Sequence, residues 1–319
     1  MSVASSVSTS QGDVPGYSRL VPVDEPFPAT GSGASGYESQ LCGLLEAGHI
    51  LFLAHSPISI PAEDRELLLG RKQTSSAYHK NIAYRPAEDR VTGLDASEQK
   101  EAAELRRLLS DYSRRATEFL DRFLTPYAGK RKLDYASFRP IEEKGRAARL
   151  HARNDLLHFD SFPTRPTNGA RILRLFTNIN PTQNRVWMTS QTFEAFGPRL
   201  ARSAGLLEVG KSPVSRAVRS VTRALRLPLK QRPPYDEIMH RCHNAMKEDA
   251  GFQANAAKNQ WEFPPESTWM VFTDCVSHSV LEGQYALEQT FLIPQIALVR
   301  PEASPLAILE RLTGNRLTI

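Results

Sequence analysis

The chain has 319 residues, of which 40% are hydrophobic and 24% are charged, and its formal net charge is +5. These proportions are ordinary for a globular protein and exclude a collagenous, coiled-coil or mostly disordered chain. Glu46 and His49 interrupt the longest apolar stretch, residues 41–53, so no run reaches the roughly 18 apolar residues of a membrane-spanning helix. The basic balance predicts an anionic partner, such as a nucleic acid, an acidic substrate or a membrane surface.

The cysteines indicate the compartment. Cys42, Cys242 and Cys275 are far apart in the sequence and odd in number. A disulfide framework is therefore not expected, and a reducing compartment fits better. The first residues show no positively charged segment followed by an apolar one, so no secretory signal is predicted. We expect a cytoplasmic protein.

In chain order, the predicted elements change from helices to strands. Residues 1–36 are rich in Ser, Gly and Pro and are predicted to be a disordered tail, which leaves residues 37–319 as one domain. A helical layer follows over residues 37–132, and its longest helix, over residues 95–124, has an apolar stripe at helical spacing. Residues 133–300 form a predicted β core, and residues 301–319 a C-terminal helix.

The predicted β core consists of short strands separated by turn signals. They span residues 149–159, 170–179, 185–189, 268–273 and 285–293. A helical insert over residues 190–262 interrupts them, with helices over residues 191–204 and 235–249. This order predicts an α+β fold whose core is an antiparallel barrel or sandwich.

His158 and Asp160 end one of these strands and are the first candidates for chemistry. Side chains two apart in a strand point to the same face, and a carboxylate in an apolar strand needs a positively charged partner. A metal ion supplies one, and two histidines with one carboxylate are the ligand set of non-haem Fe(II) oxygenases. His278, which follows the β-like residues 268–273, is the candidate third ligand. The alternative is a hydrogen-bonded His–Asp pair on the surface.

Oxygenases of this type use 2-oxoglutarate, whose distal carboxylate suits an arginine fork. Residues 279–299, where that cation often lies, contain neither Arg nor Lys. Arg171 and Arg174 are three apart in a predicted strand, so they face opposite sides, and one of them at most points into the core. We prefer Arg174, which shares its face with Asn178, and keep Arg171 as the second choice.

Two longer runs carry a family resemblance. They are LLHFDSFPTRPTNGARILRLFTNINP (residues 156–181) and FPPESTWMVFTDCVSHSVLEGQYALEQTFLIP (residues 263–294). Both resemble the bacterial 3-deoxy-D-manno-oct-2-ulosonic acid (Kdo) 3-hydroxylases, and the resemblance extends over about residues 40–300. It implies a double-stranded β-helix (jelly-roll) core, Fe(II), 2-oxoglutarate and O2, and hydroxylation at C3 of the Kdo sugar of lipid A. It also implies that His158, Asp160 and His278 are the iron ligands.

Other side chains are predicted to serve the substrate or the surface. Arg149, Arg153 and Arg165 flank the His158 strand and are candidates to hold the carboxylates and phosphates of a Kdo-lipid, although a solvated basic edge explains them as well. On the predicted helix over residues 235–249, His240 and His243 are expected to face solvent rather than to bind metal.

The basic charge is concentrated in residues 199–232, which alone carry +8, so the remainder of the chain is mildly acidic. Within this segment a short amphipathic helix is predicted, with Val214, Val218, Val221 and Leu225 on one face and Arg216, Arg219, Arg223 and Arg226 on the other. Such a helix can dock on an anionic membrane, here the inner leaflet of the inner membrane. The alternative is a helix packed on the body with a solvated arginine face.

Rival functions remain at this point. One is the same oxygenase chemistry on another anionic glycan or lipid. Another is a non-catalytic basic protein that binds membrane or nucleic acid. A nucleic-acid protein would usually draw basic residues from several segments, so no nucleic-acid partner is expected.

Overall fold

The computed structural model describes residues 14–23, 34–71, 81–94, 101–209 and 232–319. Within these residues the strands form two sheets, a larger one in the order β1-β2-β9-β6-β11-β5-β3-β4 and a smaller one in the order β10-β7-β8. The larger sheet comprises, in that order, Leu20–Pro22, Ile50–Leu53, Thr268–Phe272, Arg171–Asn178, Ala286–Ile293, Lys132–Arg139, Ile82–Arg85 and Arg90–Thr92. The smaller sheet comprises Val276–Glu282, Arg185–Thr192 and Asn259–Phe263.

Strands that are distant in the sequence lie side by side in this arrangement. β11 pairs antiparallel with both β5 and β6, and β6 also pairs with β9. The described pairings are antiparallel except for β1 with β2. Two facing antiparallel sheets with such long connections form a jelly roll, so the predicted α+β fold with a double-stranded β-helix core is confirmed.

Aromatic side chains on the inner faces join the two sheets. Phe176 of β6 stacks on Trp269 of β9, with ring centroids 5.2 Å apart. Trp187 of β7 meets Phe176 edge-on at 4.9 Å, and Phe263 of β8 stacks on Trp269 at 4.0 Å. Because alternate residues of a strand share a face, the inner residues of both sheets form one apolar core.

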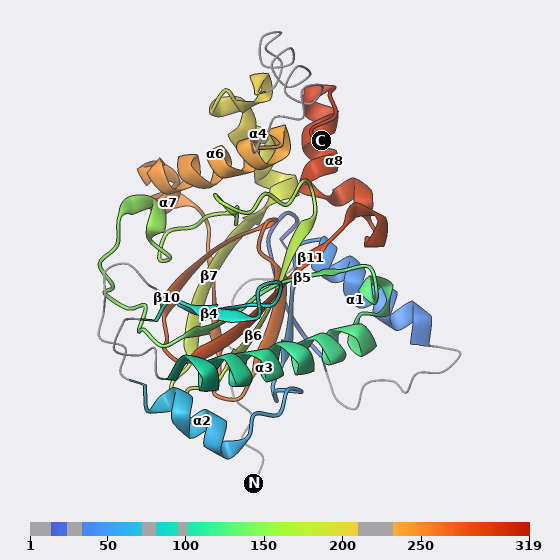
Figure 1. Cartoon of the computed structure of the whole chain (residues 1–319). Coiled ribbons are helices and arrows are strands. Elements are labelled where there is room, and N and C mark those ends of the chain that lie inside the picture. Colours follow the sequence, from blue (N-terminus) through green and yellow to red (C-terminus); the bar gives the residue numbers. More distant parts are fainter. Residues whose placement is uncertain (1–13, 24–33, 72–80, 95–100, 210–231) are drawn as a thin grey trace, which may run out of the picture.

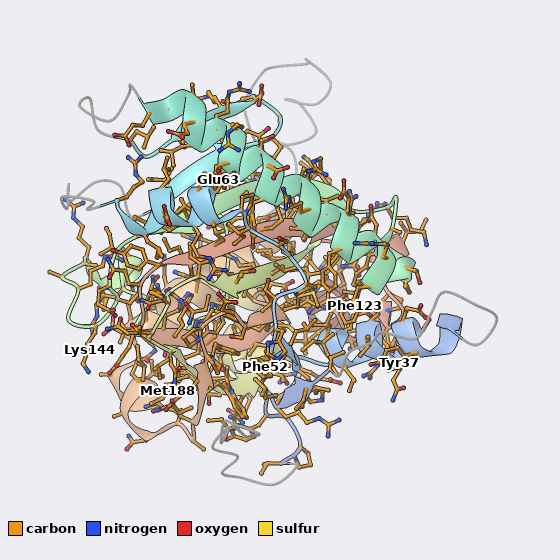
Figure 2. All side chains as sticks on the ribbon, turned by 90° about the horizontal axis from the view of Figure 1, so that it is seen from below. Tyr37, Phe52, Glu63, Phe123, Lys144 and Met188 are labelled. Carbon is orange, nitrogen blue, oxygen red and sulfur yellow. The ribbon has the colours of Figure 1, made fainter. Side chains whose placement is uncertain are left out.

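The longest helix, α3 (Ala102–Phe123), covers the outer face of the larger sheet next to β3, β4 and β5. Its buried residues recur at helical spacing, while Arg106 and Arg114 on the other side are exposed. Figure 2 shows α3 from below, with side chains filling the space behind it and Phe123 at one end. Helices α1 (Ala34–Glu46) and α2 (Ala62–Leu69) complete this layer.

The other helices gather at the opposite end of the molecule (Figure 1). They are α4 (Phe193–Ser203), α6 (Pro234–Glu248), α7 (Ala250–Asn255) and α8 (Pro305–Thr313). α4 packs against both α6 and α8. Short 3-10 turns lie at Thr125–Tyr127, Leu150–Ala152, Leu206–Glu208, Gln295–Ala297 and Pro301–Ala303. Among the described helices, none combines the length and the apolar composition needed to cross a membrane.

The expected strands over residues 170–179, 185–189, 268–273 and 285–293 are confirmed with small shifts at their ends, as are the helices over residues 191–204 and 235–249. The strand expected over residues 149–159 is wrong, because this segment contains a 3-10 turn and a single bridge at His158. The tail prediction is wrong for residues 14–23, which include β1. The prediction used the Ser, Gly and Pro content of residues 1–36. That content does not reveal a three-residue strand, because β1 is held by pairing with β2, which lies further along the chain.

Candidate metal centre

His158, Asp160 and His278 meet at the inner side of the smaller sheet. Their candidate ligand atoms all lie within 4.8 Å of one another. Both histidines are buried, and the Asp160 side chain is 13% exposed. The prediction that the distant segments around residues 158 and 278 become neighbours is therefore confirmed. The alternative of a His–Asp pair on the surface is wrong.

Backbone hydrogen bonds bring these segments together. His158 N donates to His278 O at 3.1 Å, and His278 N donates to His158 O at 3.0 Å. Asp160 N donates to Thr273 O at 2.8 Å. Residues 157–160 thus take the place of a further strand beside β10, and the register alone puts both imidazoles on one face.

The two imidazole rings are oriented in the same way. His158 Nδ1 lies 2.7 Å from Leu156 O, and His278 Nδ1 lies 2.9 Å from Val276 O. A carbonyl oxygen can only accept, so both Nδ1 atoms carry the proton and both Nε2 atoms keep a free lone pair. His158 Nε2 is 3.6 Å from Asp160 Oδ1. Two nitrogen lone pairs and a carboxylate oxygen that converge in this way fit a divalent metal ion.

The protonation states support metal binding at neutral pH. Burial lowers the pKa of His158 and of His278, so both rings are neutral. Burial alone would raise the pKa of Asp160, but the Arg174 guanidinium and the two histidines together outweigh it, and the net pKa lies well below the ordinary value. Two neutral imidazoles and one carboxylate leave one negative charge for a cation to neutralise.

Arg171 and Arg174 of β6 lie on opposite faces of the strand, as predicted. Arg174 Nη2 lies 2.9 Å from Asp160 Oδ2, and its Nη1 lies 2.8 Å from Glu288 Oε1. Arg171 is fully buried on the other face, where its Nε donates to Asp274 at 2.9 Å. Arg171 therefore balances Asp274 and faces away from the metal centre.

Asn178 shares the inner face of β6, but its side chain forms hydrogen bonds with backbone carbonyl groups. Its Nδ2 donates to Gln183 O and to Phe263 O, both at 2.9 Å. These two bonds use both amide hydrogens, so the structure places Asn178 in the support of the turn after β6.

A buried arginine that the sequence reasoning missed is Arg185, at the start of β7. It is 1% exposed, and its Nε and Nη2 have no hydrogen-bond partner among the described residues. Its Nη1 donates to Gly283 O at 3.0 Å, and Nη2 is 3.8 Å from Glu143. Burial and then the neighbouring Arg139 lower the pKa of Arg185 to about 10. This buried guanidinium therefore has donor capacity to spare among the described residues.

Trp187 connects Arg185 to the metal centre. Its ring stacks on His278 with centroids 5.3 Å apart. Since Arg185 and Trp187 are two apart in β7, they share the inner face. No local signal in the sequence identifies Arg185, because an arginine at the start of a strand is usually exposed.

The expectation of solvent-facing histidines on α6 is wrong for His243. Its ring lies 4.9 Å from that of His158, and its Nδ1 donates to Phe159 O at 2.8 Å. Burial, with a smaller effect from Lys247, lowers the pKa of His243 to about 4. Lys247, one turn later, is 4% exposed, and burial lowers its pKa to about 8. His240 is half-buried, with its ring 6.3 Å from that of His243.

The three arginines predicted to bind the substrate lie in different settings. Arg149 is exposed, and Arg153 pairs with Asp155 at the surface. The Arg165 guanidinium lies over the Phe162 ring at 4.2 Å, and Arg174 lies 5.6 Å from the same ring. Arg165 is therefore the one of the three that lies next to the metal-centre residues. The predicted membrane-docking residues, Arg216, Arg219, Arg223 and Arg226, lie outside the described residues.

Comparisons with known proteins agree with this geometry. The family model for 3-deoxy-D-manno-oct-2-ulosonic acid (Kdo) hydroxylase matches residues 30–316. A search of curated proteins finds no match. The apo structure of "the Kdo hydroxylase KdoO, a non-heme Fe(II) alphaketoglutarate dependent dioxygenase" is 30% identical, covers 94% of this chain and 97% of its own, and superposes with a TM-score of 0.78. The KdoO complex with alphaketoglutarate and Fe(III) gives a TM-score of 0.77 at the same identity and coverage. This chain belongs to the Kdo hydroxylase family.

Proposed function

We propose that this protein is an Fe(II)- and 2-oxoglutarate-dependent dioxygenase that hydroxylates C3 of the Kdo sugar of a lipid A glycolipid. The observation that carries the proposal is the buried set of His158, Asp160 and His278, preoriented for a divalent metal, in a chain of the Kdo hydroxylase family. Fe(II) at this site would supply the activation of O2, coupled to the oxidation of 2-oxoglutarate. The protein would supply the ligand geometry, the binding of the co-substrate and a site protected from water.

Arg185 is our candidate for the distal carboxylate of 2-oxoglutarate. A 2-oxoglutarate that chelates the metal through its keto end has its other carboxylate several bonds away. Arg174 is already held against Asp160, a metal ligand, and against Glu288. Arg185 is buried on the same inner face, and two of its donor nitrogens are unused among the described residues. A carboxylate there would satisfy these donors by charge-assisted hydrogen bonds.

Arg165 is our candidate for an anionic group of the sugar. Its guanidinium is held between the rings of Tyr135, at 3.8 Å, and Phe162. It also pairs with Asp134, which orients it. Arg149 and Arg153 would act further out, on phosphates or on the second sugar.

The direct test of the function uses purified enzyme with Fe(II), 2-oxoglutarate and a lipid A precursor that carries Kdo. We expect succinate formation that depends on the glycolipid, and a product heavier by one oxygen, about 16 Da, on the Kdo sugar. The control is the same lipid A without Kdo, which should leave succinate at background. Succinate formation with an unrelated anionic glycan, together with none on the Kdo glycolipid, would support the rival substrate class.

We further propose that the protein works at the cytoplasmic side of the inner membrane, docked through the basic segment over residues 199–232. The support is the concentration of charge and the amphipathic spacing in the sequence. Replacing Arg216, Arg219, Arg223 and Arg226 by Gln should weaken binding to anionic vesicles and leave turnover of a delipidated Kdo substrate unchanged. Unchanged vesicle binding would favour a helix packed on the body.

A further inference from the structure

Residues 151–160 carry two of the three candidate ligands, His158 and Asp160. This segment has backbone N–H and C=O groups along two edges, and both edges need hydrogen-bond partners. On the first edge, the backbone of His158 pairs with His278, and Val280 N donates to Asn154 O at 2.8 Å. In an antiparallel pair, the groups of alternate residues point away from that partner. The carbonyls of residues 153, 157 and 159 therefore belong to a second edge, which no described strand covers. The carbonyl of His151, in the adjoining 3-10 turn, continues this edge.

Side chains from α6 and α7 satisfy this second edge. His243 Nδ1 donates to Phe159 O at 2.8 Å. Lys247 Nζ donates to His151 O at 2.9 Å and to Arg153 O at 2.7 Å. His243 and Lys247 are one turn apart, so they lie on the same face of α6.

Gln253 of α7 is the third residue that bonds this edge. Its side-chain amide pairs with one residue of the segment through both an acceptor and a donor, as a neighbouring strand's backbone does. Its Oε1 accepts from Leu157 N at 2.9 Å, and its Nε2 donates to Leu157 O at 2.9 Å. The same Nε2 lies 2.8 Å from Met246 O of α6, which ties the side chain to the helix before it. A buried lysine is costly unless its bonds do something that apolar side chains cannot do, and the half-buried Gln253 adds bonds of the same kind. Here they hold a strand edge in place.

We propose that His243, Lys247 and Gln253 are positioning residues, which hold residues 151–159 against β10 so that His158 and Asp160 keep the geometry of the metal centre. This inference rests on the proposed metal centre and goes beyond it, since it assigns the helical insert a role in metal affinity. Displacing the segment by an ångström would move two ligands relative to His278. Loss of supporting bonds around metal ligands typically weakens metal binding by about 10- to 100-fold.

The test measures Co(II) affinity by the visible absorption of the bound ion. The variants are Lys247→Met, Gln253→Glu and the milder His243→Gln, and Lys247→Arg serves as a conservative rescue. Arg241→Met is the matched control, because Arg241 lies on the same helix, is exposed and pairs with Glu237 at 2.7 Å. Near-UV circular dichroism at the assay temperature identifies the variants that are fully folded.

We expect folded Lys247→Met and Gln253→Glu to bind Co(II) about 10- to 100-fold more weakly, Lys247→Arg to recover part of the loss and Arg241→Met to match wild type. A variant that merely loses stability would unfold at a lower temperature but bind Co(II) normally while folded. Wild-type affinity in every folded variant would overturn the positioning role. Failure of the wild-type protein itself to bind Co(II) would instead overturn the metal centre. If Lys247→Met does not fold, His243→Gln decides the question in the same way.

Discussion

The metal centre and the buried arginines both lie between the two sheets, but they offer different groups to a ligand. The metal centre offers electron-pair donors, and the arginines offer hydrogen-bond donors. At the metal centre, Asp160 faces Arg174 and two neutral histidines, and the three candidate ligand groups converge on one point. The second region, called here the arginine end, consists of Arg139 and Arg185 with the nearby Glu288 and Glu143. There, Arg185 has more N–H donors than hydrogen bonds among the described residues.

The difference shows what each end binds. Converging lone pairs with a net negative charge favour a cation, whereas unused guanidinium donors favour an anion. Arg174 and Glu288 form the boundary between the two ends, since Arg174 contacts both Asp160 and Glu288. A substrate with a metal-chelating end and a carboxylate end, as 2-oxoglutarate has, fits across this boundary.

The largest effect is expected at the metal end. Asp160→Ala removes the carboxylate ligand and leaves Arg174 without that partner, so metal binding should fall below detection and turnover by about 1,000-fold or more. Asp155→Ala is the matched control, because Asp155 is exposed and pairs with Arg153 at the surface. Succinate formation and Co(II) titration measure the two quantities. Turnover by Asp160→Ala close to that of the control would remove Asp160 from the ligand set.

The second effect concerns Glu288, at the boundary between the two ends. We expect the free energy of unfolding to depend on pH through the titration of this carboxyl group. Burial raises the pKa of Glu288, but Arg139 and Arg174 outweigh it and lower the pKa to about 2, against an ordinary value of 4.5. Because the folded-state pKa is the lower one, the stabilisation is complete above about pH 4.5 and is lost as the pH falls towards 2. The shift corresponds to about 3 kcal/mol in the free energy of unfolding.

Urea unfolding at several pH values checks this expectation. In the wild-type protein the free energy of unfolding should decline between pH 4.5 and pH 2 more steeply than in Glu288→Gln, which has no carboxylate to titrate at this position. Parallel declines in the two proteins would mean that Glu288 does not hold the arginine end together.

The smallest effect is expected at the arginine end. Arg185→Gln should raise the KM for 2-oxoglutarate by about 10- to 100-fold, since one charge-assisted carboxylate contact is lost, while Co(II) affinity stays the same. Arg114→Gln is the control, because Arg114 is exposed on α3, away from the proposed binding residues. If Arg174→Gln raised this KM and Arg185→Gln did not, the anchor would be Arg174.

The sequence predicted the parts of the molecule that depend on local spacing. His158 and Asp160 are two apart, which puts them on one face of any extended segment, and Arg171 and Arg174 are three apart, which separates them. Regular strands such as β6 and β11 were predictable because their β-forming residues lie between clear turn signals. The strand predicted over residues 149–159 was wrong, because only His158 bridges to β10 and side chains of α6 and α7 bond the outer edge of the segment.

Arg185 and His243 show what spacing does not reveal. An arginine at the start of a strand and a histidine on an amphipathic helix are usually exposed, and local pattern offers no reason to bury either. Here Arg185 is buried and His243 is half-buried because segments from elsewhere in the chain cover them: Gly283 packs on Arg185, and Phe159 contacts His243.

By itself, the sequence determined the ligand types, the face that His158 shares with Asp160, the opposed faces of Arg171 and Arg174, and the family. The tertiary structure alone decided which polar groups meet. It placed His278 beside His158, gave Arg171 to Asp274, left donors of Arg185 open and set α6 against the ligand-bearing segment. The physical reason is that side-chain direction follows from local backbone geometry, whereas the partner of a buried charge is set by strand pairing and helix packing between distant residues.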